Sequence, residues 1–150
     1  MPTETERAAP AQELPNEPRA IWAVHCQVDR ARLAAYLDWF HSVHIQEKLG
    51  RPGYAWAAHY EVLPFGQAAA GPQAAPSFLA LFGGTTTRAF LDPSPSQLKL
   101  RQDDATRRMM ACRMRSQGLV LSEEWRETAD GAGMRDVARG TAPLVELVLI

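Results

Sequence analysis

A segment spanning positions 38–60 holds three of the four histidines in this 150-residue chain. An unperturbed imidazole titrates near 6.5, so each can act as an acid or a base around neutral pH. His44 continues an apolar helical stripe formed by Leu33, Leu37 and Phe40, where a leucine would be expected. Burial on that stripe disfavours the charged imidazolium, which predicts His44 as a neutral general base. The alternative is a core histidine with its ring nitrogens satisfied by hydrogen bonds.

Three further side chains are candidates for the same reaction. Tyr60 is predicted to donate a hydrogen bond to a developing oxyanion, and His25 lies on the less apolar face of a predicted strand. His41 follows Asp38 by one helical turn, so the two could form an Asp–His pair. Packing is the alternative role for Tyr60 and His25, and exposure on the helix is the alternative for His41. The predicted catalytic set is therefore His44, Tyr60, His25 and His41.

Aromatic residues surround these candidates and could stack on a planar ligand, with core packing as the alternative. The predicted substrate-binding residues are Trp39, Phe40, Tyr54, Trp56 and Phe78. The pair His41-x-x-His44 leaves a metal ion or a haem iron as alternatives. However, the chain has no HExxH motif, no cysteine-rich ligand spacing, no phosphate-binding glycine loop and no GxSxG element. We therefore predict a reaction that uses no metal and no cofactor.

Composition indicates one globular domain. Hydrophobic residues make up 46% of the chain and charged residues 22%, which is ordinary for a domain with a real core. The formal net charge of -1 argues against a nucleic-acid partner. A local group of arginines, flanked by acidic residues, is predicted to form a solvated helix face, with an anionic ligand as the alternative. This group is Arg107, Arg108, Arg113 and Arg115.

Residues 1–19 are rich in proline and glutamate and are predicted to form a disordered arm, whereas residues 20–150 are predicted to fold as the single domain. No apolar run approaches the ~20 residues needed to span a membrane, and no secretory signal is recognisable. Cys26 and Cys112 lie in no ligand spacing, which suits buried thiols in a reducing compartment. These features predict a cytoplasmic protein without a membrane partner.

Alternating polarity and capping signals define the expected elements. They are strands at 21–28, 54–63, 77–82, 119–128 and 144–150, helices at 30–49, 86–91 and 96–116, and a loop at 64–76. In the strand at 54–63, Tyr54, Trp56 and Tyr60 are expected on one face and His59 on the other. His44 and Tyr60 are then expected to face each other across one pocket.

The order of these elements is β-α-β-β-α-β with an extra C-terminal strand, which predicts an α+β, ferredoxin-like subunit. Its helices would cover one face of the sheet and leave the other bare. Two subunits can remove this exposure by packing their bare faces together. We therefore expect a homodimeric α/β barrel, with an apolar pocket between the sheet and the helices of each subunit.

Several short motifs in this order resemble the EthD-like branch of the dimeric α/β-barrel superfamily. They are Trp39-Phe40-x-x-x-His44, Pro52-Gly53-Tyr54, His59-Tyr60, the strand Pro76–Leu81 and the short helix Thr86–Leu91. The chain departs from that pattern where Phe40 lacks a hydroxyl, where His41 and its neighbours replace acidic residues, and where His59 replaces an arginine. The resemblance implies cofactor-free chemistry on hydrophobic, aromatic or polyketide-like molecules.

The resulting hypothesis is a cofactor-free lyase or cyclase that abstracts a proton from an activated carbon of a hydrophobic substrate. His44 would be the base, Tyr60 the oxyanion partner, and His25 and His41 auxiliary groups. Two alternatives stay open: a cofactor-independent monooxygenase of the same fold, and a non-catalytic small-molecule-binding subunit. The last alternative predicts a pocket closed by side chains and a fully hydrogen-bonded His44.

Overall fold

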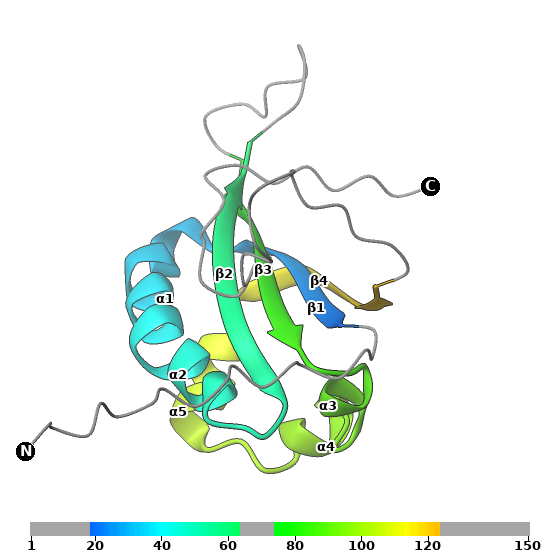
Figure 1. Ribbon diagram of the computed structural model, residues 1–150. Helices are drawn as coiled ribbons and strands as arrows, with labels where there is room; N and C mark the ends of the chain where they lie inside the picture. The colour runs from blue at the N-terminus through cyan, green and yellow to red at the C-terminus, as the bar shows by residue number, and fades with distance from the viewer. Residues whose placement is uncertain (1–18, 64–73, 124–150) are drawn as a thin grey trace, which may run out of the picture.

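Four strands form one antiparallel sheet in the computed structural model, which describes residues 19–63 and 74–123 (Figure 1). The strands are β1 (Ala20–Val28), β2 (Tyr54–Val62), β3 (Ser77–Gly84) and β4 (Arg113–Ser122), arranged in the order β2-β3-β1-β4. Almost all of the predicted N-terminal arm and the whole predicted strand at 144–150 lie outside the described residues. No helix in the described part of the chain is long and apolar enough to cross a membrane.

The strand order contains two split β-α-β units. β1 and β2 run in the same direction because both pair antiparallel with β3, which lies between them. β3 and β4 are related in the same way, with β1 between them. This arrangement confirms the α+β class and is compatible with the ferredoxin-like plan.

The connection from β1 to β2 is one helical run with three kinds of turn. It comprises η1 (Arg30–Arg32), α1 (Leu33–Trp39), the π-helical η2 (Phe40–His44) and α2 (Ile45–Leu49). The Asp29 carboxylate caps it by accepting a hydrogen bond from the Ala31 amide at 3.0 Å. The run therefore has the extent predicted for the helix at 30–49, but the π turn was not predicted.

The π turn changes which side chains are buried. In a regular α-helix, residues four apart drift around the axis because each turn takes 3.6 residues. The wider π turn reduces that drift. As a result Tyr36, Phe40, His44 and Lys48, each four residues after the last, are all buried.

The long helix predicted at 96–116 is wrong. The structure has three short helices between β3 and β4: α3 (Arg88–Leu91), α4 (Pro95–Lys99) and α5 (Asp104–Met110). Ser94 and Gln97 form a capping box that starts α4, and the Asp103 side chain caps α5 through the Thr106 amide at 2.7 Å. The strand predicted at 119–128 begins instead at Arg113, because β4 pairs with the whole length of β1.

Helices α1, α2 and α5 lie on the same side of the sheet, and α3 and α4 lie near one end of it (Figure 1). The main core fills the space between these helices and the sheet. It combines Val24, Cys26 and Val28, which alternate along β1, with side chains from the neighbouring elements. These include Tyr36, Trp39, Phe40, Phe78, Ala80, Phe82, Phe90 and Cys112.

A β-bulge in β2 changes the predicted faces of that strand. The pairing with β3 skips between Tyr54 and Trp56, so these two residues lie on opposite faces rather than on one. Tyr54 packs in the main core against Phe82 and Phe90. Trp56 lies on the other face, where a Cβ atom at Gly83 would overlap its indole ring. A small residue at position 83 is therefore what lets Trp56 lie flat across the sheet.

Candidate functional site

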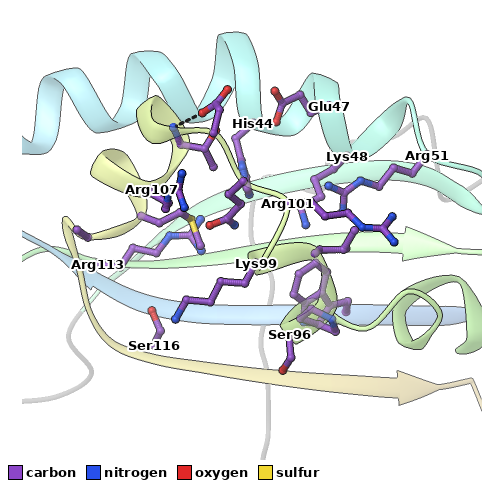
Figure 2. Close-up of a pocket in the computed structure, with 18 residues that line it drawn as sticks. His44, Glu47, Lys48, Arg51, Ser96, Lys99, Arg101, Arg107, Arg113 and Ser116 are labelled. Atoms are coloured by element: carbon purple, nitrogen blue, oxygen red, sulfur yellow. Dashed lines mark hydrogen bonds between the residues drawn. The ribbon is translucent and has the colours of Figure 1, made fainter.

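A cavity of about 860 Å³ lies between the helical run of residues 33–49, the segment carrying α4 and α5, and strands β1 and β4 (Figure 2). Its lining residues are Trp22, His44, Glu47, Lys48, Arg51, Pro95, Ser96, Leu98, Lys99, Arg101, Gln102, Asp103, Thr106, Arg107, Met110, Ala111, Arg113 and Ser116. Figure 2 shows that His44 and Lys48 come from the helix above the sheet, whereas Arg113 and Ser116 come from β4. The walls are thus contributed by both split units.

The cavity is strongly cationic. Six of its lining residues are lysine or arginine and only two, Glu47 and Asp103, are acidic. The Asp103 carboxylate already accepts the hydrogen bond that caps α5, and Arg107 forms an ion pair with Asp104 at 2.7 Å. Among the described residues, no ion pair engages Lys48, Arg51 or Arg113. The alternative that the arginine group serves an anionic ligand thus applies to Arg107 and Arg113, which line the cavity, but not to Arg108 and Arg115.

His44 is buried in the wall of this cavity, with 5% of its surface exposed. Its ring packs against those of Trp39 and Phe40, at centroid distances of 4.8 Å and 5.2 Å. Burial, helped by the positive charges of Arg113, Lys48 and Arg51, lowers the pKa of His44 from 6.5 to about 3. His44 is therefore neutral at physiological pH, and its Nδ1 atom is buried without a hydrogen-bond partner.

Lys48 also lines the cavity, although the sequence did not predict it as a site residue. Only 6% of it is exposed, and its Nζ atom lies 4.7 Å from the centroid of the Trp22 ring. Burial, followed by repulsion from Arg51 and Arg113, lowers the pKa of Lys48 from 10.5 to about 7. The signal in the sequence was its spacing of four from His44, but a lysine near a helix end is ordinarily expected at the surface.

Two arginines complete the cationic wall. Arg113 donates from Nε to the Tyr36 hydroxyl at 2.6 Å, and its guanidinium lies over the rings of Tyr36 and Phe40. Burial raises the pKa of Tyr36 to about 12, so the hydroxyl remains protonated. Arg51 has a buried Nη1 atom without a hydrogen-bond partner. Both guanidinium groups can therefore offer N–H donors to a ligand.

The predicted pairing of His44 with Tyr60 is wrong, because the two lie on opposite sides of the sheet. Tyr60 packs on the face away from the helices, beside Leu79. His25 pairs with the same Leu79 from β1 and lies on that face too. Strand alternation instead turns His59 toward the helices, as the out-of-phase positions of His59 and Tyr60 predicted.

His41 and His59 form a separate pair. His41 Nε2 and His59 Nδ1 are 2.9 Å apart, so His41 is bonded to His59 and not to Asp38. The His59 ring stacks between Phe40 and Phe78, at 4.4 Å and 5.1 Å. Burial, with a contribution from His41, lowers the pKa of His59 from 6.5 to about 4. Neither histidine lines the cavity, which places His41 away from His44.

None of the five predicted substrate-binding aromatics lines the cavity. Trp39 and Phe40 enclose His44, and Phe78 supports His59 from the sheet. Tyr54 belongs to the main core and Trp56 to the other face. The aromatic residue that does line the cavity is Trp22 of β1, which was not among the predicted site residues.

Comparisons with known proteins do not narrow the assignment. No protein-family model matches the chain, and a search of curated proteins finds no match. Within the described residues, no group of three histidine, cysteine, aspartate or glutamate side chains is placed to hold a metal ion. The residues that line the cavity are therefore the basis for assigning a function.

Proposed function

We propose that this cavity binds a small organic anion and that the protein acts on it as a cofactor-free lyase or cyclase, with His44 as the base. The observation that carries the proposal is the cavity itself. It gathers six basic side chains, and the buried His44 Nδ1 and Arg51 Nη1 atoms beside it have no partner. Buried polar groups are ordinarily hydrogen-bonded, so an anionic ligand would accept the hydrogen bond that the described residues leave open at Arg51 Nη1.

The proposed substrate has an apolar body as well as an anionic group. Trp22, Leu98 and Met110 provide apolar surface in the same cavity. A carboxylate on the substrate would face Arg51 and Arg113, and the remainder would pack against the indole of Trp22. This changes the predicted substrate from a purely hydrophobic molecule to an amphipathic one.

The proposed reaction begins with proton transfer from a carbon next to a carbonyl group to neutral His44. The negative charge that develops on the carbonyl oxygen would be stabilised by a guanidinium, which takes the role that the sequence predicts for Tyr60. In the empty cavity burial disfavours protonation of His44, and the neighbouring cations disfavour it further. An anionic substrate offsets them and raises the pKa of the base, so binding prepares His44 to accept the proton.

The non-catalytic alternative predicted a closed pocket and a fully hydrogen-bonded His44. The open volume of about 860 Å³ and the unpartnered Nδ1 atom favour a protein that takes up a ligand beside a base. They do not favour a histidine with a purely structural role.

Proton transfer can be tested with phenylpyruvate, an aromatic anion with exchangeable protons next to its carbonyl group. In D₂O the wild-type protein should accelerate exchange of these protons over buffer, measured by ¹H NMR. His44→Gln should return the rate to background, whereas His41→Gln, outside the cavity, should not. Bound phenylpyruvate without accelerated exchange would contradict the proposed role of His44, and oxygen uptake on turnover would favour the monooxygenase instead.

We further propose that the sheet face away from the helices packs against a second copy, as in an EthD-like α/β barrel. Among the described residues no helix covers that face. Leu119 and Leu121 of β4 pair with Ala23 and Ile21 on it and are 43% and 37% exposed. A dimer would bury these leucines.

Because Cys26 and Cys112 are buried free thiols, we also propose a reducing, cytoplasmic location.

A further inference from the structure

We propose that Lys48 is a nucleophile that forms a Schiff base with the carbonyl group of the anionic ligand. The inference rests on the proposed function, because it places the reacting carbonyl in the same cavity. It adds a covalent step and narrows the ligand to a compound that carries both an anionic group and an aldehyde or ketone.

The position of Lys48 is unusual for a lysine. The side chain follows His44 by one helical turn on the same buried face and reaches into the cavity from α2 (Figure 2). Its Nζ atom lies over the indole of Trp22. Within the described residues no carboxylate forms an ion pair with it. A buried ammonium without a carboxylate partner is costly, so the site favours the neutral amine.

Only the neutral amine can attack a carbonyl carbon. Arg51 and Arg113 beside Lys48 disfavour its charged form, in addition to the effect of burial. With a pKa of about 7, about half of the Lys48 side chains are neutral at pH 7, whereas an ordinary lysine is almost entirely charged. Desolvation and a neighbouring cation are known ways of activating a lysine for this chemistry.

The step balances without an oxidant, a reductant or a cofactor. The lone pair of Nζ forms a bond to the carbonyl carbon while the C=O π electrons move to oxygen, giving a carbinolamine after proton transfer. His44, which precedes Lys48 by one helical turn, would carry the first proton from Nζ to the oxygen, giving the carbinolamine hydroxyl. A second proton, taken from solvent, then lets this hydroxyl leave as water. The product is an iminium cation, and the ligand's own carboxylate compensates its charge in this cationic cavity.

The low lysine content of the chain supplies a matched control for Lys48. Lys48 and Lys99 are the only two lysines among the 150 residues, and both line the cavity. Lys99 is exposed on α4, so it is the matched control for a lysine in the same cavity that is not buried. The 14 remaining basic residues are arginines, which do not form Schiff bases under these conditions.

The experiment is reductive trapping of the wild-type protein with 4-carboxybenzaldehyde and sodium cyanoborohydride at pH 7, followed by peptide mapping by mass spectrometry. We expect alkylation of Lys48 at least tenfold faster than that of Lys99. Benzaldehyde, which lacks the carboxylate, should label Lys48 much more slowly, and benzoate should protect it. An Arg108→Gln variant, altered outside the cavity, should retain the full rate of Lys48 labelling.

Two results would overturn the inference. One is labelling of Lys99 at a rate equal to or above that of Lys48, and the other is equal labelling of Lys48 by the two aldehydes. If benzoate binds but Lys48 is not trapped, the Schiff base fails while the anion site stands. If benzoate does not bind at all, the proposed function fails first.

Discussion

Two adjacent turns of one helix bury two basic side chains, His44 and Lys48, against the same cavity. Burial and the neighbouring cations lower the pKa of both, to about 3 and about 7. Each group is therefore held in a more neutral state than it would have in water. An anion in the cavity would therefore raise the pKa of both residues, because its negative charge favours their protonated forms.

The burial of His44 predicts a specific pH dependence of stability. Between its folded pKa of about 3 and its ordinary value of 6.5, the unfolded chain binds a proton that the folded protein does not. The contribution of His44 to stability is therefore complete above pH 6.5 and is lost as the pH falls toward 3. At pH 5 this penalty is about 2 kcal/mol for His44 alone.

Urea denaturation at pH 8 and pH 5 measures this penalty. The fall in unfolding free energy from pH 8 to pH 5 should be about 2 kcal/mol smaller in His44→Gln than in the wild type. The measurement at pH 8 serves as the control within each variant, because His44 is neutral in both states there. An equal fall in both proteins would contradict the buried, neutral histidine.

At the residue scale, the sequence predicted the buried position of His44, which the structure confirms, but did not single out Lys48 beside it. His44 interrupts an apolar stripe, and such an interruption is visible in a single sequence. Lys48 and Arg113 give no such signal, because the sequence alone does not distinguish a buried lysine or arginine from an exposed one. Tyr60 was paired with His44 although only its neighbour His59 lies on the helix side of the sheet.

At the scale of elements, α5 and its N-cap residue contribute to the lining of the cavity. Asp103 starts α5 by accepting the hydrogen bond from the Thr106 amide, and it is also one of the two acidic residues of the lining. Its two effects can be separated by substitution, because serine is also a good N-cap but carries no charge.

Asp103→Ala should lower the melting temperature by several degrees and also tighten benzoate binding, since both the cap and a repelling charge are removed. Asp103→Ser should tighten benzoate binding with little loss of thermal stability. Thermal unfolding and titration calorimetry on the two variants give both quantities. Weaker benzoate binding in Asp103→Ser would contradict the electrostatic account of the cavity.

The strands were predictable and the second helical connection was not. Alternating residues identified β1 and β2, and a short apolar run identified β3, each within one or two residues of its ends. The predicted helix at 96–116 failed because an apolar stripe can span a break between two helices. Asp103, a good N-cap inside that segment, is the sequence signal for the start of the second helix. The bulge in β2 has no comparable signal.

At the scale of the whole molecule, the exposed leucines of β4 bear on the proposed dimer. Leu119→Arg places a charge on the sheet face away from the helices and should convert a dimer into the 16.6 kDa monomer in sedimentation velocity. Leu91→Arg, on α3, should not, although Leu91 is also exposed. A wild-type protein that sediments as a monomer at micromolar concentration would contradict the dimer and leave the cavity unaffected.

The central claim is that the cavity under the helical run of residues 33–49 is an anion site. Titration calorimetry with benzoate and its neutral counterpart, benzyl alcohol, tests it most directly. The account predicts that benzoate binds, that its affinity falls as salt is added, and that Arg113→Gln weakens it about tenfold while Arg108→Gln, outside the cavity, does not. Equal binding of the two compounds, or benzoate binding that is the same in Arg113→Gln, would contradict it.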